Sequence, residues 1–83
     1  MLMYEKEVDK VVKAVLLDHL KFRKEVEASK ESQEQIAENL GISDRHVRNL
    51  QTKNRPISAY LLYQMSIVFH KPMEYFLLIL EED

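Results

Sequence analysis

The sequence has no cysteine, one glycine and two prolines among its 83 residues. Without cysteine the chain forms neither a disulfide nor a thiolate metal site, which fits a reducing compartment. Glycine and proline are the residues that most often interrupt helices, so their scarcity favours a helical chain with few loops. The two prolines, Pro56 and Pro72, both stand in the second half of the chain.

Long apolar runs are also missing. No stretch approaches the roughly 18 uninterrupted apolar residues of a membrane-spanning helix, so we expect no membrane protein. The first ten residues, MLMYEKEVDK, carry charges where a secretory signal would be apolar, so we expect no signal peptide and a cytoplasmic protein. The length suits one domain and a hydrophobic share of 46% suffices for a packed core, so residues 1–83 are predicted to form a single domain.

The charges are distributed unevenly along the chain. The total is −2, from 12 basic and 14 acidic residues. Residues 43–55 nevertheless contain four basic side chains and one acidic one, a net charge of +3, which leaves −5 for the rest of the chain. A domain with one basic face and an acidic remainder orients itself on a polyanion. The alternative interpretation is an ordinary solvated helix face.

Helical periodicity is present at both ends of the chain. From residue 4 to about residue 29, the side chains at helical spacing are Val8, Val11, Val12, Val15, Leu16, His19, Phe22 and Val26. This spacing predicts one long amphipathic helix, or two that abut. Near the other end, Pro72 suits the first turn of a helix that would continue through the apolar segment 75–80, YFLLIL.

The middle of the chain predicts two short helices joined by a glycine turn. Ser32 can cap a helix together with Gln35, and that helix ends at Gly41, the one glycine of the chain. Glycine enters the left-handed backbone region without a steric penalty, so it is favoured just past a helix end. Ala37, one turn before the glycine, lets a second helix approach closely.

The second short helix begins after Ser43 and runs to about Thr52. Val47 and Leu50 are spaced so that both face the first helix. Ser58 then caps a further helix that continues for about three turns. With the two end segments, these helices predict an all-α, compact five-helix domain with an extended amino-terminal helix.

Residues 20–80 resemble the phage-repressor and Cro-type helix-turn-helix family of DNA-binding domains. SQEQIAENLGIS is similar to the family's first motif helix with its cap, alanine and glycine turn, and SDRHVRNLQ is similar to its recognition helix. The segment NRPISAYLLYQMSIVFHKPMEYFLL resembles the family's linker and last two helices. The resemblance implies a lambda-repressor-like fold, with a helix-turn-helix motif over about residues 32–51, and binding of double-stranded DNA.

In such motifs the second helix enters the major groove and its first turns meet base edges. The resemblance therefore implies two sets of site residues. The residues expected to contact bases are Asp44, Arg45, His46, Arg48 and Asn49. The residues expected to contact phosphates are Gln33, Ser43, Lys53, Asn54 and Arg55. The alternatives are that the arginines are ordinary surface residues and that His46 is a passive exposed histidine.

Catalysis and metal binding find no support in the sequence. There is no Ser/His/Asp set, no phosphate-binding glycine loop and no pair of convergent carboxylates. His19 and His70 lack the spacing of metal ligands, and the tyrosines and phenylalanines fit core and interface positions better than a base-stacking surface. We therefore expect no enzymatic activity, no cofactor and no metal.

The leading hypothesis is a sequence-specific transcriptional regulator, a repressor that binds DNA as a homodimer. The expected dimer interface is the carboxy-terminal segment 75–80, with Tyr75, Leu78 and Ile79, and the rival interface is the valine stripe of the amino-terminal helix. The alternative function is an antitoxin or phage accessory protein whose main partner is another protein, held through that amino-terminal helix.

Overall fold

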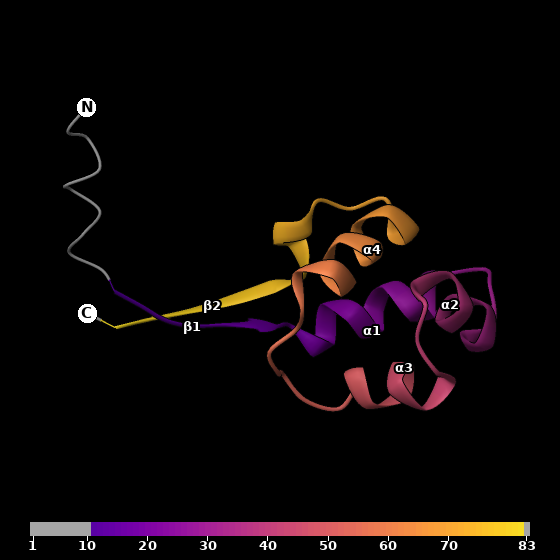
Figure 1. The fold of residues 1–83 in the computed structure, drawn as a ribbon, viewed down its shortest axis with the longest axis horizontal. Helices are drawn as coiled ribbons and strands as arrows, with labels where there is room; N and C mark the ends of the chain where they lie inside the picture. Colours follow the sequence, from indigo (N-terminus) through magenta and orange to yellow (C-terminus); the bar gives the residue numbers. More distant parts are fainter. Residues whose placement is uncertain (1–10, 83) are drawn as a thin grey trace.

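The structure is a computed structural model that describes residues 11–82. The elements are β1 (Val11–Leu17), α1 (His19–Ala28), α2 (Gln33–Leu40), α3 (Asp44–Leu50), α4 (Ala59–Phe69), the 3₁₀-helix η2 (Met73–Phe76) and β2 (Leu77–Glu82). The helices gather into one body, from which β1 and β2 extend together as a two-stranded antiparallel ribbon (Figure 1). The described chain is an α+β domain, so the prediction of an all-α five-helix fold was wrong.

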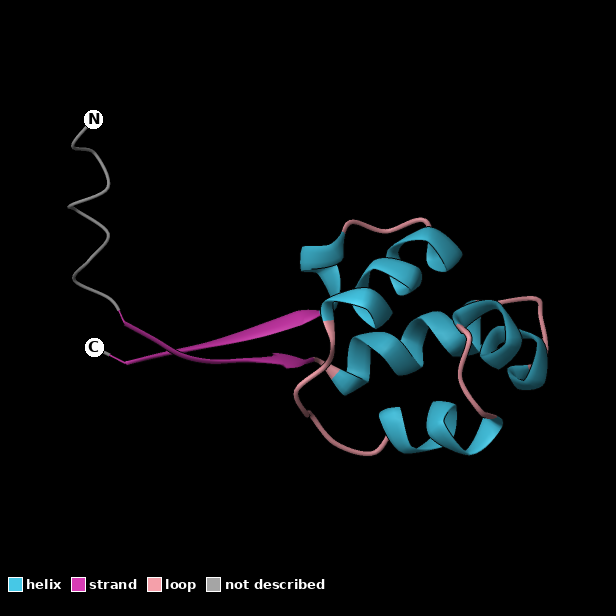
Figure 2. Cartoon of the chain, viewed as in Figure 1, coloured by secondary structure: helices cyan, strands magenta, loops and turns pink. Residues whose placement is uncertain are grey.

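The helix predicted for residues 4–29 was wrong for residues 11–17 (Figure 2). Val11–Leu17 form a strand, and α1 begins only at His19, while residues 4–10 lie outside the described part of the chain. The apolar spacing fits a helix, but valine favours strands, because its branched side chain loses rotamer freedom in a helix. The Asp18 carboxylate then caps α1 by accepting two amide hydrogen bonds, at 3.1 and 3.3 Å.

The helix predicted after Pro72 was also wrong. Only the short 3₁₀-helix η2 follows the proline, and the chain continues as strand β2 (Leu77–Glu82). An uninterrupted apolar run such as LLIL is compatible with a strand or a helix, and its own periodicity does not decide between them. The segment forms a strand here because it pairs with β1 in an antiparallel register, in which Leu17 pairs with Leu77 and Val15 with Ile79.

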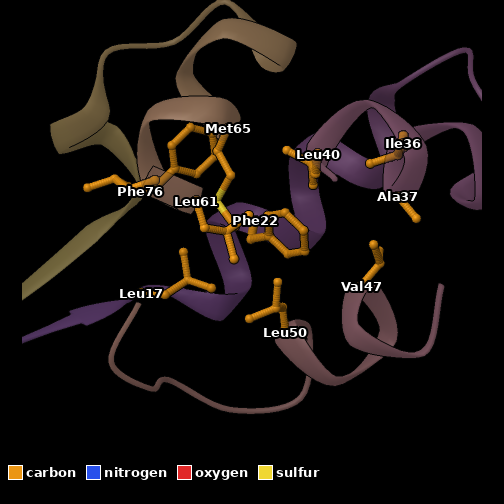
Figure 3. Packing of buried hydrophobic residues seen from close by; sticks show 11 residues of the cluster. Leu17, Phe22, Ile36, Ala37, Leu40, Val47, Leu50, Leu61, Met65 and Phe76 are labelled. Carbon is orange, nitrogen blue, oxygen red and sulfur yellow. The ribbon is translucent and has the colours of Figure 1, made fainter. Parts of the chain in front are cut away.

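One hydrophobic core joins the four α-helices, the end of β1 and η2 (Figure 3). Its buried members are Leu17, Phe22, Ile36, Ala37, Leu40, Val47, Leu50, Leu61, Leu62, Met65 and Phe76. Phe69 links Phe22 and Phe76, with ring centroids 6.0 and 5.9 Å away. Each fully buried large apolar side chain contributes about 1.5–3 kcal/mol. Leu17 and Leu77, at the end of the ribbon nearest the helices, belong to or pack against the core, whereas Val11, Val12, Ile79 and Leu80 are exposed.

Candidate nucleic-acid interface

Helices α2 and α3 are joined by a tight turn at Gly41. Gly41 adopts φ 76° and ψ 29°, in the left-handed region that favours glycine. Its N–H donates to the Glu38 carbonyl at 3.1 Å, and the Ile42 N–H donates to the Ala37 carbonyl at 3.0 Å. This Schellman arrangement satisfies the last carbonyls of α2 and reverses the chain. The turn predicted at Gly41 is confirmed.

Serine hydroxyls begin each of the three helices α2, α3 and α4. In each case the hydroxyl accepts the amide hydrogen bond of the residue three positions ahead, at 3.0 to 3.1 Å: Ser32 for α2, Ser43 for α3 and Ser58 for α4. Such a cap contributes about 1 kcal/mol. The second bond of the predicted capping box, from the Ser32 N–H to the Gln35 side-chain oxygen, is not made, and Gln35 Nε2 donates to Asn39 Oδ1 at 3.2 Å. The cap at Ser43 determines where α3 begins, and so which of its residues face outward.

Helix α3 buries one side and exposes the other. Val47 and Leu50 face the core, with 0% and 2% of their surface exposed, as the spacing predicted. Close contact between the two helices is possible because Ala37 of α2 is small and buried. The exposed residues of α3 are Arg45, His46, Arg48 and Asn49, and Asp44 is half-buried. Four of the five side chains expected to contact bases therefore lie open on one helix of seven residues.

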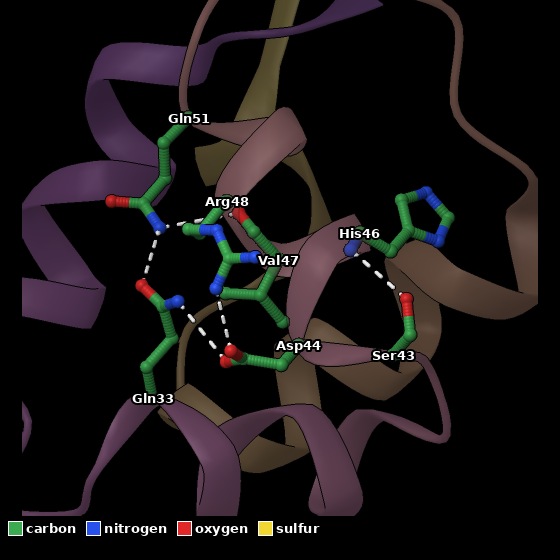
Figure 4. A network of polar contacts seen from close by, with 7 residues as sticks. All are labelled: Gln33, Ser43, Asp44, His46, Val47, Arg48 and Gln51. Carbon is green, nitrogen blue, oxygen red and sulfur yellow. Dashed lines mark hydrogen bonds and ion pairs between the residues drawn. The ribbon is translucent and has the colours of Figure 1, made fainter.

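A polar network connects α2 to α3 (Figure 4). The Gln33 side chain donates from Nε2 to Asp44 Oδ1 at 3.1 Å, and Arg48 Nη1 lies 2.6 Å from Asp44 Oδ2. Gln51 Nε2 donates to Gln33 Oε1 at 3.2 Å and to the Val47 carbonyl at 3.1 Å. Gln33, expected to grip phosphate, and Asp44, expected to read a base, thus bond each other in the free protein. The bond between Gln33 and Asp44 was not foreseen from the sequence.

The loop after α3 has residues with structural contacts of their own. Asn54 Oδ1 accepts the His19 N–H at 2.9 Å, and His19 Nδ1 lies 2.6 Å from the same oxygen. The Arg55 carbonyl accepts the Leu17 N–H at 2.7 Å, and Arg55 Nη2 donates to Thr52 Oγ1 at 3.2 Å. Both residues therefore tie this loop to the start of α1 and the end of β1. Lys53, in contrast, is exposed.

The three residues expected at the dimer interface lie in two different places. Tyr75 belongs to η2, and its hydroxyl donates to Glu25 Oε2 at 2.7 Å. This hydrogen bond, with smaller effects of burial and neighbouring carboxylates, raises the pKa of Tyr75. Two lysine ammonium groups, from Lys21 and Lys71, lie 5.2 and 5.1 Å from its ring centre. Tyr75 therefore contacts its own helical body.

The other two, Leu78 and Ile79, lie on the ribbon. Leu78 pairs with Leu16, and Ile79 pairs with Val15. The carboxy-terminal segment and the amino-terminal valine stripe had been considered as rival interfaces. In the structure Val11–Leu17 and Leu77–Glu82 are the two paired strands of one ribbon, so the two rival apolar segments lie side by side.

The part of the chain that the structure describes contains no group of three or more histidine, aspartate or glutamate side chains able to hold a metal ion. Over the same residues no helix is long and apolar enough to cross a membrane. Comparisons with protein-family models, with curated proteins and with solved structures each gave no match.

Proposed function

We propose that this protein is a sequence-specific regulator of transcription, a repressor that binds double-stranded DNA as a homodimer in the cytoplasm. The observation that carries the proposal is the α2–turn–α3 unit. It buries one side of α3 on Val47 and Leu50 and leaves Arg45, Arg48 and Asn49 exposed on the other. An α-helix presented in this way fits the major groove, where each base pair has its own pattern of donors and acceptors.

The exposed side chains have the chemistry that base reading requires. An arginine can bridge O6 and N7 of guanine, and an asparagine can bridge N6 and N7 of adenine, each pairing contributing about 1–3 kcal/mol of discrimination. The polar groups around this helix would contact the DNA phosphates. Lys53 supplies an exposed charge, and the Ser43 hydroxyl accepts a bond from His46 while keeping its own proton to donate.

Selection of bound duplexes from a random DNA pool tests the proposal. We expect the pool to converge on one sequence with two related half-sites about 34 Å apart, one turn of DNA. A variant with Arg45 and Arg48 both replaced by alanine is the control and should not enrich that sequence. If the natural protein enriches no sequence over several rounds, the proposal is wrong.

The ribbon supports the homodimer. Its large exposed apolar residues are Val11, Val12, Val15, Ile79 and Leu80. Two-stranded ribbons are marginally stable in water when nothing covers them. Strands that are apolar on successive positions are typical of sheets covered on both faces. A second ribbon offers the same apolar surface, and symmetric pairing would give the two α3 helices that a near-palindromic site requires.

Substitutions at two isoleucines of nearly equal exposure test whether the ribbon, and not another apolar surface, forms the dimer interface. Ile79 on the ribbon is 52% exposed, and Ile67 on α4 is 51% exposed. We expect Ile79→Glu to convert the dimer into a monomer in multi-angle light scattering, because two carboxylates would be buried, and Ile67→Glu to remain dimeric. A dimeric Ile79→Glu protein, or a natural protein that is monomeric both free and on DNA, would disprove the ribbon interface.

The second candidate function is an antitoxin or phage accessory role with a protein as main partner. The amino-terminal helix expected to hold that partner is a strand over Val11–Leu17. A different observation favours the candidate: Tyr60, Tyr63 and Ile67 lie along α4 at helical spacing and are all more than half exposed. Two results together would favour this candidate over the first. The protein would co-purify with the product of a neighbouring gene, and Tyr63→Glu would abolish this co-purification. The natural protein would also enrich no sequence from the random DNA pool.

A further inference from the structure

Asp44 stands at the centre of the network that connects α2 to α3 (Figure 4). Both of its carboxylate oxygens are occupied: Oδ1 accepts from Gln33 at 3.1 Å, and Oδ2 lies 2.6 Å from Nη1 of Arg48. The Arg48 side chain is nonetheless 58% exposed. One nitrogen of the guanidinium is therefore held by Asp44 on α3, while much of the arginine side chain stays exposed to solvent.

An exposed aspartate–arginine pair one helical turn apart is by itself weak, because solvent screens it and two side chains lose freedom. Here the Asp44 carboxylate also accepts a hydrogen bond from Gln33, a residue outside the pair. Gln33 comes from α2, and its own Oε1 accepts from Gln51, which donates in turn to the Val47 carbonyl of α3. Asp44 is thus fixed by the neighbouring helix and by the α3 backbone, so it can impose a direction on Arg48.

We infer that Asp44 does not contact a base and is a positioning residue that sets the base preference of Arg48. The inference rests on the proposed DNA binding and deepens it. A freely rotating arginine can bond a phosphate or any nearby acceptor, whereas bridging O6 and N7 of guanine requires one orientation of the planar fork. Asp44 supplies that orientation, and its negative charge makes phosphate a less favourable alternative for the same arginine.

The inference changes the role that the sequence suggested for Asp44. An aspartate that reads a base accepts a hydrogen bond from cytosine N4, which needs a carboxylate lone pair directed into the groove. Each oxygen of Asp44 already accepts one hydrogen bond from the protein, and these two bonds orient the carboxylate toward Gln33 and Arg48. Gln33 keeps one of its two amide hydrogens, so a phosphate contact at Gln33 and the orientation of Arg48 would support each other through Asp44.

The test measures base preference position by position on the selected operator, with every single-base variant of one half-site. Arg48→Ala identifies the base pair that Arg48 reads. We expect Asp44→Ala to relax the preference at that same base pair by about tenfold, with binding to random DNA unchanged or stronger. The double variant should match Arg48→Ala alone, because Asp44 acts only through Arg48.

Two further variants control for charge and folding. Glu34→Ala also removes an acidic charge from a first helical turn, that of α2, and should leave every base preference unchanged. Asp44→Asn keeps an oxygen acceptor but loses the charge, and should lie between the natural protein and Asp44→Ala. Thermal unfolding of each variant separates loss of specificity from loss of structure, and Asp44→Asn supplies the comparison if Asp44→Ala does not fold.

Three results would overturn the inference. If Asp44→Ala relaxes a different base pair from Arg48→Ala, Asp44 reads a base itself. If Asp44→Ala changes no preference, the pair is only a solvated contact. Both results leave the proposed DNA binding intact. If the natural protein selects no DNA sequence, the proposed function fails and the inference fails with it.

Discussion

Replacement of Gly41 tests the turn that sets α3 against α2. At φ 76° an alanine is in the left-handed region, which costs an L-residue about 1–2 kcal/mol. A Cβ placed on Gly41 would meet no atom within 4 Å, so steric contact with the rest of the protein adds nothing. Gly41→Ala should therefore cost about 1 kcal/mol, Gly41→Asn less, because asparagine tolerates this region, and Gly41→Val more, because its branched side chain does not.

Thermal unfolding followed by circular dichroism measures these differences. In a domain of this size, 1 kcal/mol lowers the melting temperature by about 4–8 °C. The expected order of melting temperatures is natural protein, Asn, Ala and Val at position 41. Glu38→Ala, an exposed change inside α2, is the control and should stay within about 0.5 kcal/mol of the natural protein. A Gly41→Val protein that melts with the natural protein would refute the left-handed turn.

Two further predictions concern charge and pH. Lys53→Ala should weaken binding to the selected operator and to random DNA alike, and should reduce the slope of log K against log salt by about one unit. A loss confined to the operator would instead make Lys53 a base reader. The raised pKa of Tyr75, due first to its bond to Glu25, favours the protonated phenol in the fold, so stability should fall as pH rises above 10.0, the ordinary value. Urea unfolding between about pH 9 and pH 11 should show a smaller fall for Tyr75→Phe, and equal falls in both proteins would contradict this role.

The middle of the fold could be predicted because its determinants are local. Ser32, Ser43 and Ser58 each bond an amide three residues ahead, and Gly41 ends α2 through its own backbone conformation. Such contacts depend on residues within one turn of each other, so their spacing in the sequence is sufficient information. Asp18 belongs to the same class, and a search for helix caps would have placed the start of α1 there.

The ribbon could not be predicted in the same way, because its strands come from opposite ends of the chain. Val15 becomes a strand residue by pairing with Ile79, and nothing near either residue in the sequence specifies that partner. In VVKAVLL the spacing of apolar residues favours a helix, whereas the valine content favours a strand. The segment is a strand because it pairs with β2 in the folded protein. The contacts of Gln33 with Asp44, and of Asn54 with His19, were missed for the same reason.

The most direct measurement of the proposed function is a titration of the selected operator, labelled with a fluorophore, followed by anisotropy. We expect Arg45→Ala and Arg48→Ala each to weaken binding by about 1–3 kcal/mol, while their melting temperatures stay at that of the natural protein, because both side chains are exposed and outside the core. If both variants bind the operator as tightly as the natural protein, α3 does not read DNA and the assignment of its outer face is wrong.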